Sequence, residues 1–518
     1  MKMRTRESVG GPGVALGYIL AVLAVPAGYA ATSGPAADSR LVEAAMRGDQ
    51  TTVRALVSQH ADVNSAQADG TTALFWAART NDLDIAKLLI AHGAAVNTAN
   101  RYGVTALSLA ASNGSAPMTD VLLKAGANAN MVLPGGVTVL ITAARSGNPD
   151  VVKALLDHGA DVNAKESVEQ ETALMYAATE NHPEVVRLLI DRGADVNTRS
   201  NVLDPKMPTP KYEPKPGMHF LTGGMTALLF AARQGAMESA RVLADGKADL
   251  NLADPDGLTP MILAIMNANY DLAAMLLEKG ADPNVVDVSG RGALFAAVDM
   301  HRLEWLFSRP TPKSSGKLDS ADIAKLLLEK GANPNARLTK RVKGLQHNSG
   351  GNSNLSVGST PFMKAATTSD IALMRLLVAH GADTNLTNEG GATPLMIAAG
   401  IKWSDLSGLG SQSESIEAIQ LCLDHGADVN ATNNLGETAL HGAAERGADS
   451  VVSFLASKGA KLDARTKNGV TPLDVTLGQS ATKDDADARK PERVSTGALL
   501  RKLMKENGVN SVASGGGQ

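Results

Sequence analysis

The chain contains very little cysteine and few aromatic residues. Its 518 residues include 1 cysteine, 3 tryptophans, 6 tyrosines and 7 phenylalanines. The single cysteine, Cys422, excludes an intramolecular disulfide, a zinc site built from cysteine pairs and a lipid-modified cysteine near the N-terminus. Aromatic residues make up 3% of the chain and hydrophobic residues 44%. This balance favours thin layers of Ala, Leu and Val over one thick globular core.

Charge of one sign is also scarce. The formal net charge is -4, and it becomes -6 without residues 1–30, because that segment carries three basic residues and one acidic residue. A mildly acidic chain lacks the basic surface that binds phosphate backbones. We therefore expect no nucleic acid partner.

The sequence motifs of common catalytic and metal sites are missing. The chain has no His-Glu-x-x-His, no Gly-x-Ser-x-Gly and no glycine-rich phosphate loop ending in Lys-Ser/Thr. Four histidines each stand directly before a glycine, at equivalent positions of the sequence repeats described below. Equivalent positions in adjacent repeats of packed helices lie about 10 Å apart, which is too far for their side chains to share one zinc ion. We expect them to contact free carbonyls at helix C-termini, and we expect no enzyme activity, cofactor or metal. The four residues are His92, His158, His380 and His425.

A phrase of the form Thr-Ala/Pro-Leu-x-x-Ala-Ala returns along the chain, most often at one constant interval, which is the step from Thr72 to Thr105. A second phrase, Gly-Ala-Asp-x-Asn, follows each copy of the first. A fixed period of about 20 to 50 residues predicts a solenoid. The first phrase begins at Thr72, Thr105, Thr138, Thr172, Thr226, Thr259, Thr360, Thr393, Thr438 and Thr471.

Each phrase has a physical role. Thr followed by Pro or Ala starts a helix, because the hydroxyl caps free amides and proline at the first position loses no hydrogen bond. The alanine pair lets a neighbouring helix approach closely, and a second helix with apolar residues at helical spacing follows. Glycine then ends that helix, and Asp and Asn suit the turn after it.

These units resemble ankyrin repeats, and the resemblance covers residues 38–508. It implies an all-α solenoid of about twelve helix-turn-helix units with finger loops. It also implies a protein-binding groove lined by the finger tips and by the positions after each alanine pair. The family's usual histidine is present only as His441.

The N-terminus predicts export. Three basic residues precede an apolar run at residues 14–25, and small residues follow at Gly28 and Ala30. We expect a signal peptide at residues 1–30, a linker at 31–37, and no membrane span after cleavage. An uncleaved anchor is the alternative. Together these features favour a periplasmic or secreted protein.

Five insertions interrupt the repeats. Two of these insertions lie on the fingers, two lie at the opposite edge, where the helices of a unit join, and one lies in the last unit. After the repeats, residues 509–518 form a tail that we expect to be disordered. We expect the two edge insertions to lie about 20 Å apart, since one repeat separates them. The insertions are residues 199–223, 307–318, 337–358, 402–415 and 479–493.

The predicted partner-binding residues lie on the groove, the fingers and the insertions. Arg79, Arg145 and Arg233 occupy equivalent positions after the alanine pairs, where their guanidinium groups would suit an acidic partner. Tryptophan, tyrosine and arginine are the residue types that dominate binding energy. The full set is Arg79, Arg101, Tyr102, Arg145, Glu180, Arg233, Tyr212, Trp305 and Trp403.

The sequence thus predicts an exported, monomeric, non-enzymatic binding protein whose partner is another protein, in the bacterial periplasm. One alternative is a secreted effector that engages a host protein. Another is an enzyme with a site grafted onto the insertions. Two structural explanations compete with a binding role. The groove residues can be ordinary solvent-exposed positions, and the insertions can be long surface loops that the fold tolerates.

Overall fold

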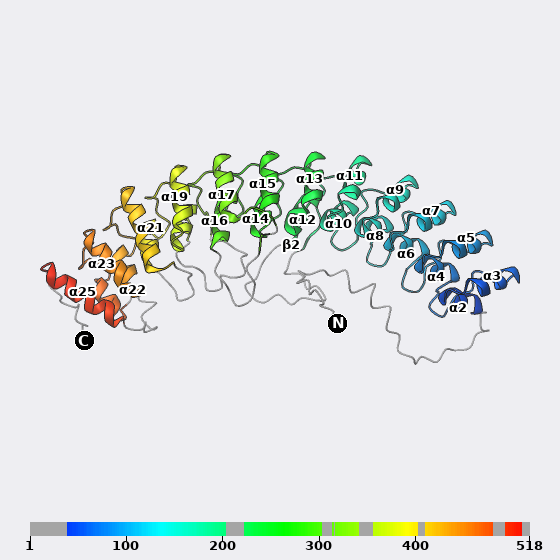
Figure 1. The fold of residues 1–518 in the computed structure, drawn as a ribbon, viewed down its shortest axis with the longest axis horizontal. Helices are drawn as coiled ribbons and strands as arrows, with labels where there is room; N and C mark the ends of the chain where they lie inside the picture. Colours follow the sequence, from blue (N-terminus) through cyan, green and yellow to red (C-terminus); the bar gives the residue numbers. More distant parts are fainter. Residues whose placement is uncertain are drawn as a thin grey trace.

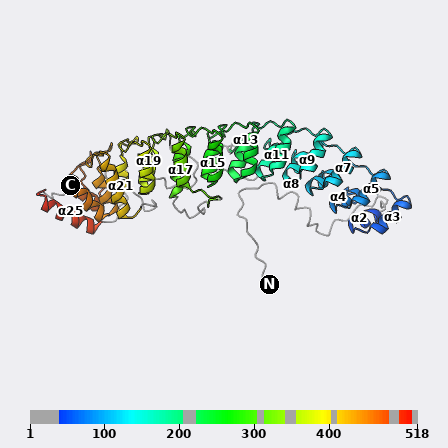
Figure 2. The same cartoon turned by 45° about the horizontal axis from the view of Figure 1, so that its top comes forward.

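The computed structural model describes residues 39–203, 222–302, 313–314, 316–340, 356–401, 410–479 and 493–509. The predicted signal peptide, the linker, the last nine residues of the tail and the central part of every insertion lie outside these ranges. Within them the chain is built from helices, as the repeat phrases predict, and the helices stand in consecutive pairs. The pairs form one curved array (Figure 1), and Figure 2 shows the same array turned.

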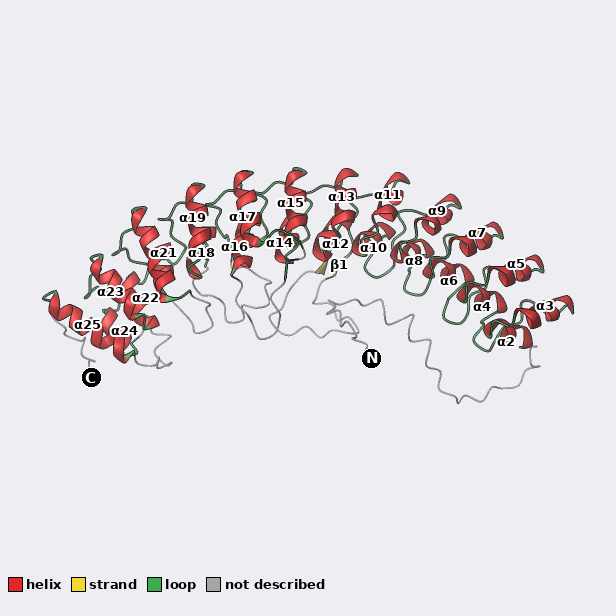
Figure 3. Cartoon of the chain, in the orientation of Figure 1, coloured by secondary structure: helices red, strands yellow, loops and turns green. Residues whose placement is uncertain are grey.

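The first helix of each pair lies on the concave side of the arc, as Figures 1 and 3 show. These inner helices are short because each ends soon after its alanine pair. They are α2 (Arg40–Met46), α4 (Ala73–Arg79), α6 (Ala106–Ser112), α8 (Val139–Ser146), α10 (Ala173–Thr179), α12 (Ala227–Gln234), α14 (Pro260–Met266), α16 (Ala293–His301), α18 (Pro361–Thr367), α20 (Pro394–Ala399), α22 (Ala439–Arg446) and α24 (Pro472–Thr476).

The second helix of each pair lies on the convex side. These outer helices pack against their inner partners and against the neighbouring outer helices. They are α3 (Gln50–Ser58), α5 (Leu83–Ala91), α7 (Ala116–Lys124), α9 (Pro149–Asp157), α11 (Pro183–Asp191), α13 (Met237–Asp245), α15 (Tyr270–Glu278), α17 (Ser320–Glu329), α19 (Ile371–Ala379), α21 (Gln412–Asp424), α23 (Asp449–Ser457) and α25 (Val494–Glu506). The number of repeats, about twelve, stays a prediction.

The predicted helix starts are confirmed. The hydroxyl of Thr259 accepts a hydrogen bond from the amide of Ile262 at 3.3 Å, and Pro260 occupies the first turn. The degenerate unit differs, because Gly292 stands in the capping position and supplies no side-chain cap to α16. The alanine pairs are buried as expected. Ala177 and Ala178 of α10 retain 0% of their surface, where α8 and α12 pack against that helix.

An asparagine ladder joins successive units along the finger edge. The Asn130 side chain donates to the carbonyl of Gly159 and accepts from the amide of Asp161, both at 2.8 Å. The last residue of the Gly-Ala-Asp-x-Asn phrase is therefore a link between repeats. The same two bonds to the next unit are made by Asn64, Asn97, Asn163, Asn284, Asn335 and Asn430.

Replacing Asn130 with alanine should lower the free energy of unfolding by about 1–3 kcal/mol, since two hydrogen bonds are lost and each contributes about 0.5–1.5 kcal/mol net. Urea unfolding followed by circular dichroism measures this change. Lys87→Ala, at an exposed position on α5, is the control and should change it by less than about 0.5 kcal/mol. Equal effects of the two substitutions would contradict a linking role for Asn130.

The finger before α10 is one residue longer than its neighbours, because the step from Thr138 to Thr172 exceeds the usual interval by one. Glu166 accounts for this spacing. Its buried carboxylate accepts the amides of Val168 at 2.7 Å, of Glu169 and of Glu171 at 3.2 Å. In the finger before α6, the shorter side chain of Asn100 accepts the amides of Tyr102 and Val104, so its turn closes four residues after the asparagine. Glutamate reaches one residue further than asparagine, so the turn closes around the extra residue.

The fingers contribute little strand. β1 (Val202–Leu203) pairs antiparallel with β2 (Thr222–Gly223), at the base of the insertion at residues 199–223. Adjacent fingers are joined by tip hydrogen bonds, such as the amide of Arg101 to the carbonyl of Asp69 at 2.8 Å. Among the described residues, no helix has the length and apolar character needed to cross a bilayer.

Candidate protein-binding surface

Three arginines recur in the last turn of alternate inner helices. Arg79 lies on α4, Arg145 on α8 and Arg233 on α12, each seven residues after the capping threonine. Arg79 and Arg233 are exposed and Arg145 is half-buried. None of these groove arginines forms an ion pair with another residue in the described part of the chain. The structure therefore places the three predicted residues at equivalent points on the concave side.

Arg79 is held against an aromatic platform. Its guanidinium carbon lies 5.2 Å from the centre of the Trp76 ring, one helical turn earlier. The indole Nε1 donates to the Gln67 side chain at 3.3 Å, which ties the platform to the preceding finger. Trp76 is partly buried and packs against the hydrophobic core, and it also supports Arg79.

Arg233 is held in the same way on α12. Its guanidinium carbon lies 5.0 Å from the centre of the Phe230 ring, and its Nη1 donates to the Met225 sulfur at 3.4 Å. Phe230 is buried and belongs to the hydrophobic core. Although part of the arginine remains exposed, burial of the guanidinium lowers the pKa of Arg233, and nearby Glu171 and Glu169 oppose that change.

An acidic residue lies beside Arg233 at the base of the groove. The Glu171 carboxyl comes from the finger before α10 and interacts with the side chain of Tyr176. Burial, and then the charge of Glu169, raises the pKa of Glu171 to about 7. The pKa of Tyr176 is also raised, mainly by burial, whereas the charge of Arg145 acts to lower it. Residues of α8, α10 and α12 therefore form one continuous electrostatic cluster.

Neutralising Glu171 should stabilise the protein at high pH. Because its folded-state pKa lies above the unfolded value near 4.5, stability is highest when the group is protonated and falls as pH rises from about 4.5 through 7. Glu171→Gln should therefore raise the melting temperature at pH 8.5 and change it little at pH 4.5. Thermal melts at the two pH values measure this, with Glu180→Gln as an exposed control. An equal shift at both pH values would contradict the assignment.

Two further predicted residues lie on the finger before α6. Arg101 and Tyr102 are both exposed, and the guanidinium carbon of Arg101 lies 4.8 Å from the centre of the Tyr102 ring. Glu180, at the end of α10, is exposed as well. Together with the groove arginines, these residues lie in the first half of the chain. Tyr212, Trp305 and Trp403 lie outside the described residues.

The equivalent positions at α18 and α20 are covered. Thr367, Thr368 and Ile401 retain 1–3% of their surface, so they do not offer the open lining that their sequence positions indicate. Lys364 of α18 is paired with Asp299 of α16 at 2.7 Å, with 10% and 16% of the two side chains exposed. The equivalent residues at the end of α22 are half-buried. We call the segment from α4 to α12, which carries the groove arginines, the open groove.

The residues flanking the two edge insertions meet directly. Arg302, before the first insertion, pairs with Glu414 of α21 at 3.0 Å and donates to the carbonyl of Thr368 at 3.1 Å. His301 pairs with buried Asp370, and the hydrogen bond raises the pKa of the histidine. Helix packing distances predict a separation of two repeats between the insertions. The side chains at their bases are nevertheless in contact, because Arg302 reaches across the intervening repeat.

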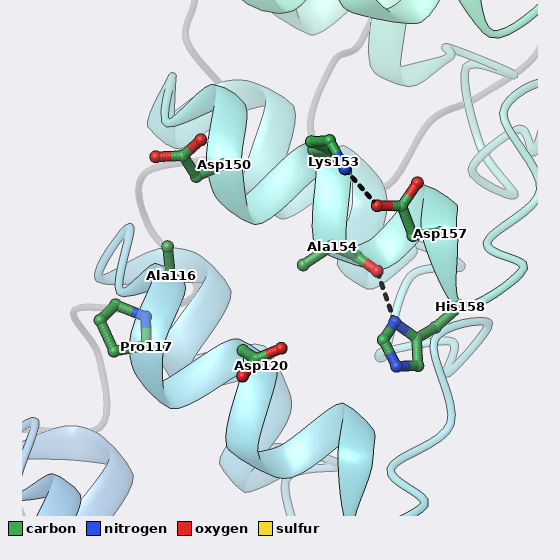
Figure 4. A pocket seen from close by; sticks show the side chains of 8 residues that line it. All are labelled: Ala116, Pro117, Asp120, Asp150, Lys153, Ala154, Asp157 and His158. Carbon is green, nitrogen blue, oxygen red and sulfur yellow. Dashed lines mark hydrogen bonds and ion pairs between the residues drawn. The ribbon is translucent and has the colours of Figure 1, made fainter.

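Figure 4 shows a shallow hollow on the convex side, between α7 and α9, with charged side chains around it. Lys153 pairs with Asp157 at 2.5 Å, and His158 Nδ1 lies 2.9 Å from the carbonyl of Ala154. This histidine contact confirms the predicted role at a helix C-terminus. The same contact recurs at His92, His380 and His425.

Two features bear on chemistry other than binding. Cys422 is fully buried in α21, and burial raises the pKa of its thiol to about 12. It is a core residue. In the part of the chain that the structure describes, no three His, Cys, Asp or Glu side chains are grouped to hold a metal ion.

The family pattern "Ankyrin repeats (3 copies)" matches residues 41–132, 117–200, 212–287, 317–402 and 409–480. The chain belongs to the ankyrin repeat family. Ankyrin solenoids use their concave surfaces for binding, so membership indicates a protein partner. The resemblance to ankyrin repeats, which was inferred from the repeated sequence phrases, is therefore confirmed.

The chain is also similar to parts of longer curated proteins. It is 29% identical over 180 residues to the B-cell lymphoma 3 protein homolog of Mus musculus, covering 34% of this chain and 32% of that protein. It is 29% identical over 183 residues to protein glp-1 of Caenorhabditis elegans, covering 31% of this chain and 13% of that protein. The chain therefore spans a third or less of each of these two proteins. The human ASB11 ankyrin repeat domain aligns at 25% identity with a TM-score of 0.38, over 48% of this chain and all of that domain.

Sequence reasoning missed Glu171, Tyr176 and Met225. Glu171 and Met225 immediately precede the capping threonine, a position that is valine or leucine in several other units. A charged residue at a position that is apolar in several other units is the signal that would have found Glu171. Tyr176 occupies the same repeat position as Trp76 and Phe230, so the aromatic stripe was visible in the sequence once the repeats were aligned.

Proposed function

We propose that this protein is an exported, non-enzymatic binding protein that holds a protein partner in the open groove from α4 to α12. The observation that carries this proposal is the set of groove arginines. Two of them lie on aromatic rings, and none is ion-paired with another described residue. Such preorganised arginines bind with little loss of side-chain freedom. The chain acts as a monomer, and its site of action is the bacterial periplasm.

Site-specific photocrosslinking in living cells tests the groove. A photoreactive residue in place of Ser112, exposed at the end of α6, should capture a partner. The same residue in place of Lys153, exposed on α9, is the matched control on the convex side. Crosslinks from position 112 and none from position 153 support the proposal. Capture only from position 153, or from neither, would overturn it.

Export is tested by the mass of the mature chain. Protein from the periplasmic fraction should begin at Ala31, or at Gly28 if the earlier junction is cleaved, since small residues occupy both junctions. Recovery of the protein from the culture medium instead would favour a secreted effector. Intact Met1 on soluble periplasmic protein would show that residues 1–30 are not removed.

A further inference from the structure

The groove arginines present hydrogen-bond donors in a fixed orientation. A guanidinium that lies on an aromatic ring by its face keeps the N–H groups along its edge directed outward. The guanidinium carbon of Arg79 lies over the Trp76 ring at 5.2 Å and that of Arg233 over the Phe230 ring at 5.0 Å, which leaves donors free for a ligand, although Arg233 Nη1 also donates to the Met225 sulfur. The edge of a guanidinium matches the two oxygens of a carboxylate, and the pair is bidentate. These two positions are therefore shaped for carboxylates.

The spacing of the arginines indicates the form of the ligand. They lie on α4, α8 and α12, so one inner helix separates each from the next. Packed helices lie about 10 Å apart, which puts neighbouring arginines about 20 Å apart. An extended polypeptide advances about 3.3 Å per residue, so about six residues span that distance.

We propose that the groove binds an extended acidic segment of the partner, with carboxylate side chains about six residues apart on Arg79, Arg145 and Arg233. This inference rests on the proposed function and adds the chemistry of the partner to it. An ankyrin groove that binds a folded surface needs no such regular spacing. The regular placement of the arginines in this chain is what specifies an extended ligand.

Acidic groups between the arginines narrow the class of ligand. Glu180 is exposed at the end of α10, between α8 and α12, and Glu169 and Glu171 lie near Arg233. A nucleic acid backbone carries a phosphate at every step, so some phosphates would lie against these carboxylates. A polypeptide places its charges selectively, with acidic residues at the arginines and a basic or neutral residue at Glu180.

A selection from random 16-residue peptides displayed on phage tests the proposal on the full chain. We expect enrichment of peptides with two or three Asp or Glu residues spaced by about six positions. Changing Arg79, Arg145 and Arg233 together to glutamine should weaken a peptide that pairs with all three about 100- to 1000-fold, since each charge-assisted pair contributes about five- to tenfold. The same changes at Arg54, Arg187 and Arg375, exposed on outer helices, should weaken it less than about twofold.

Three results would overturn the inference. They are selection of no binding peptide, enrichment of peptides without regularly spaced acidic residues, and a dT16 oligonucleotide that competes with the peptide at the same arginines. None of these affects the photocrosslinks from position 112. Failure of the acidic-segment proposal is thus distinguishable from failure of the proposed function.

Discussion

Changing Arg79, Arg145 and Arg233 together to glutamate should abolish capture of the partner while helix content stays the same. The partner would lose three donors and meet three new negative charges in the groove, a change of six charge units. Exposed substitutions such as Arg79→Glu usually cost less than about 0.5 kcal/mol each. Arg145 and the guanidinium of Arg233 are partly buried, so the variant should be less stable than the wild-type protein but should remain helical. Pull-down of the partner together with circular dichroism measures both properties.

The matched control makes the same change of six charge units on the convex side. Arg54, Arg187 and Arg375 are exposed on α3, α11 and α19, and changing all three to glutamate should leave capture intact. Full binding by the groove variant would show that recognition does not take place between α4 and α12. The insertions would then become the better candidate.

Replacing Phe362 with alanine should cause the largest loss of stability from one substitution, about 3–5 kcal/mol. Phe362 retains 0% of its surface and is the largest fully buried side chain in α18, which packs against α16 and α20. In those neighbours the same position is leucine, at Leu294 and Leu395. Because each repeat is stabilised mainly by its neighbours, the middle of the array should unfold first.

Two companion variants make the test specific. Phe362→Leu restores the residue type of the neighbouring repeats and should cost less than about 1.5 kcal/mol. Phe454→Ala removes the same atoms from a half-buried position on α23 and should cost clearly less than Phe362→Ala. Urea unfolding measures all three, and similar losses for the two alanine variants would contradict the role of burial.

The fold was predictable from sequence because its determinants are local and repeated. A capping threonine, an alanine pair and a glycine stop act within one unit, and a nearly constant period repeats them often enough to be read. The three groove arginines were predictable for the same reason, since equivalent positions in a solenoid face the same way. The longer finger before α10 also had a sequence signal, in the lengthened step from Thr138 to Thr172.

Contacts between distant residues were not predictable in this way. The pair Arg302–Glu414 joins residues 112 positions apart, and neither belongs to a repeat phrase. Gly442 is another case, because a Cβ there would lie 2.5 Å from the amide nitrogen of Ile401. Its position in the helix carries large side chains in other units, such as Trp76 and Tyr176. The glycine is explained only by the close approach between α22 and the backbone at Ile401, which lies between α20 and α21.

The burial of the groove positions at α18 and α20 also depends on three-dimensional packing. Thr367, Thr368 and Ile401 have the same sequence positions as exposed residues in the first half, yet they are buried. The position of a residue in a repeat therefore predicts the direction of its side chain but not its exposure. That difference removes α18 and α20 from the candidate surface.

Hydrogen–deuterium exchange of the purified complex tests the central claim most directly. If the partner lies in the open groove, its binding should slow exchange in the inner helices α4 to α12 and in the fingers before them. The outer helices α5 to α13 and the segment from α18 to α24 should exchange as in the free protein. Protection confined to the outer helices, or to the second half of the array, would contradict recognition by the groove.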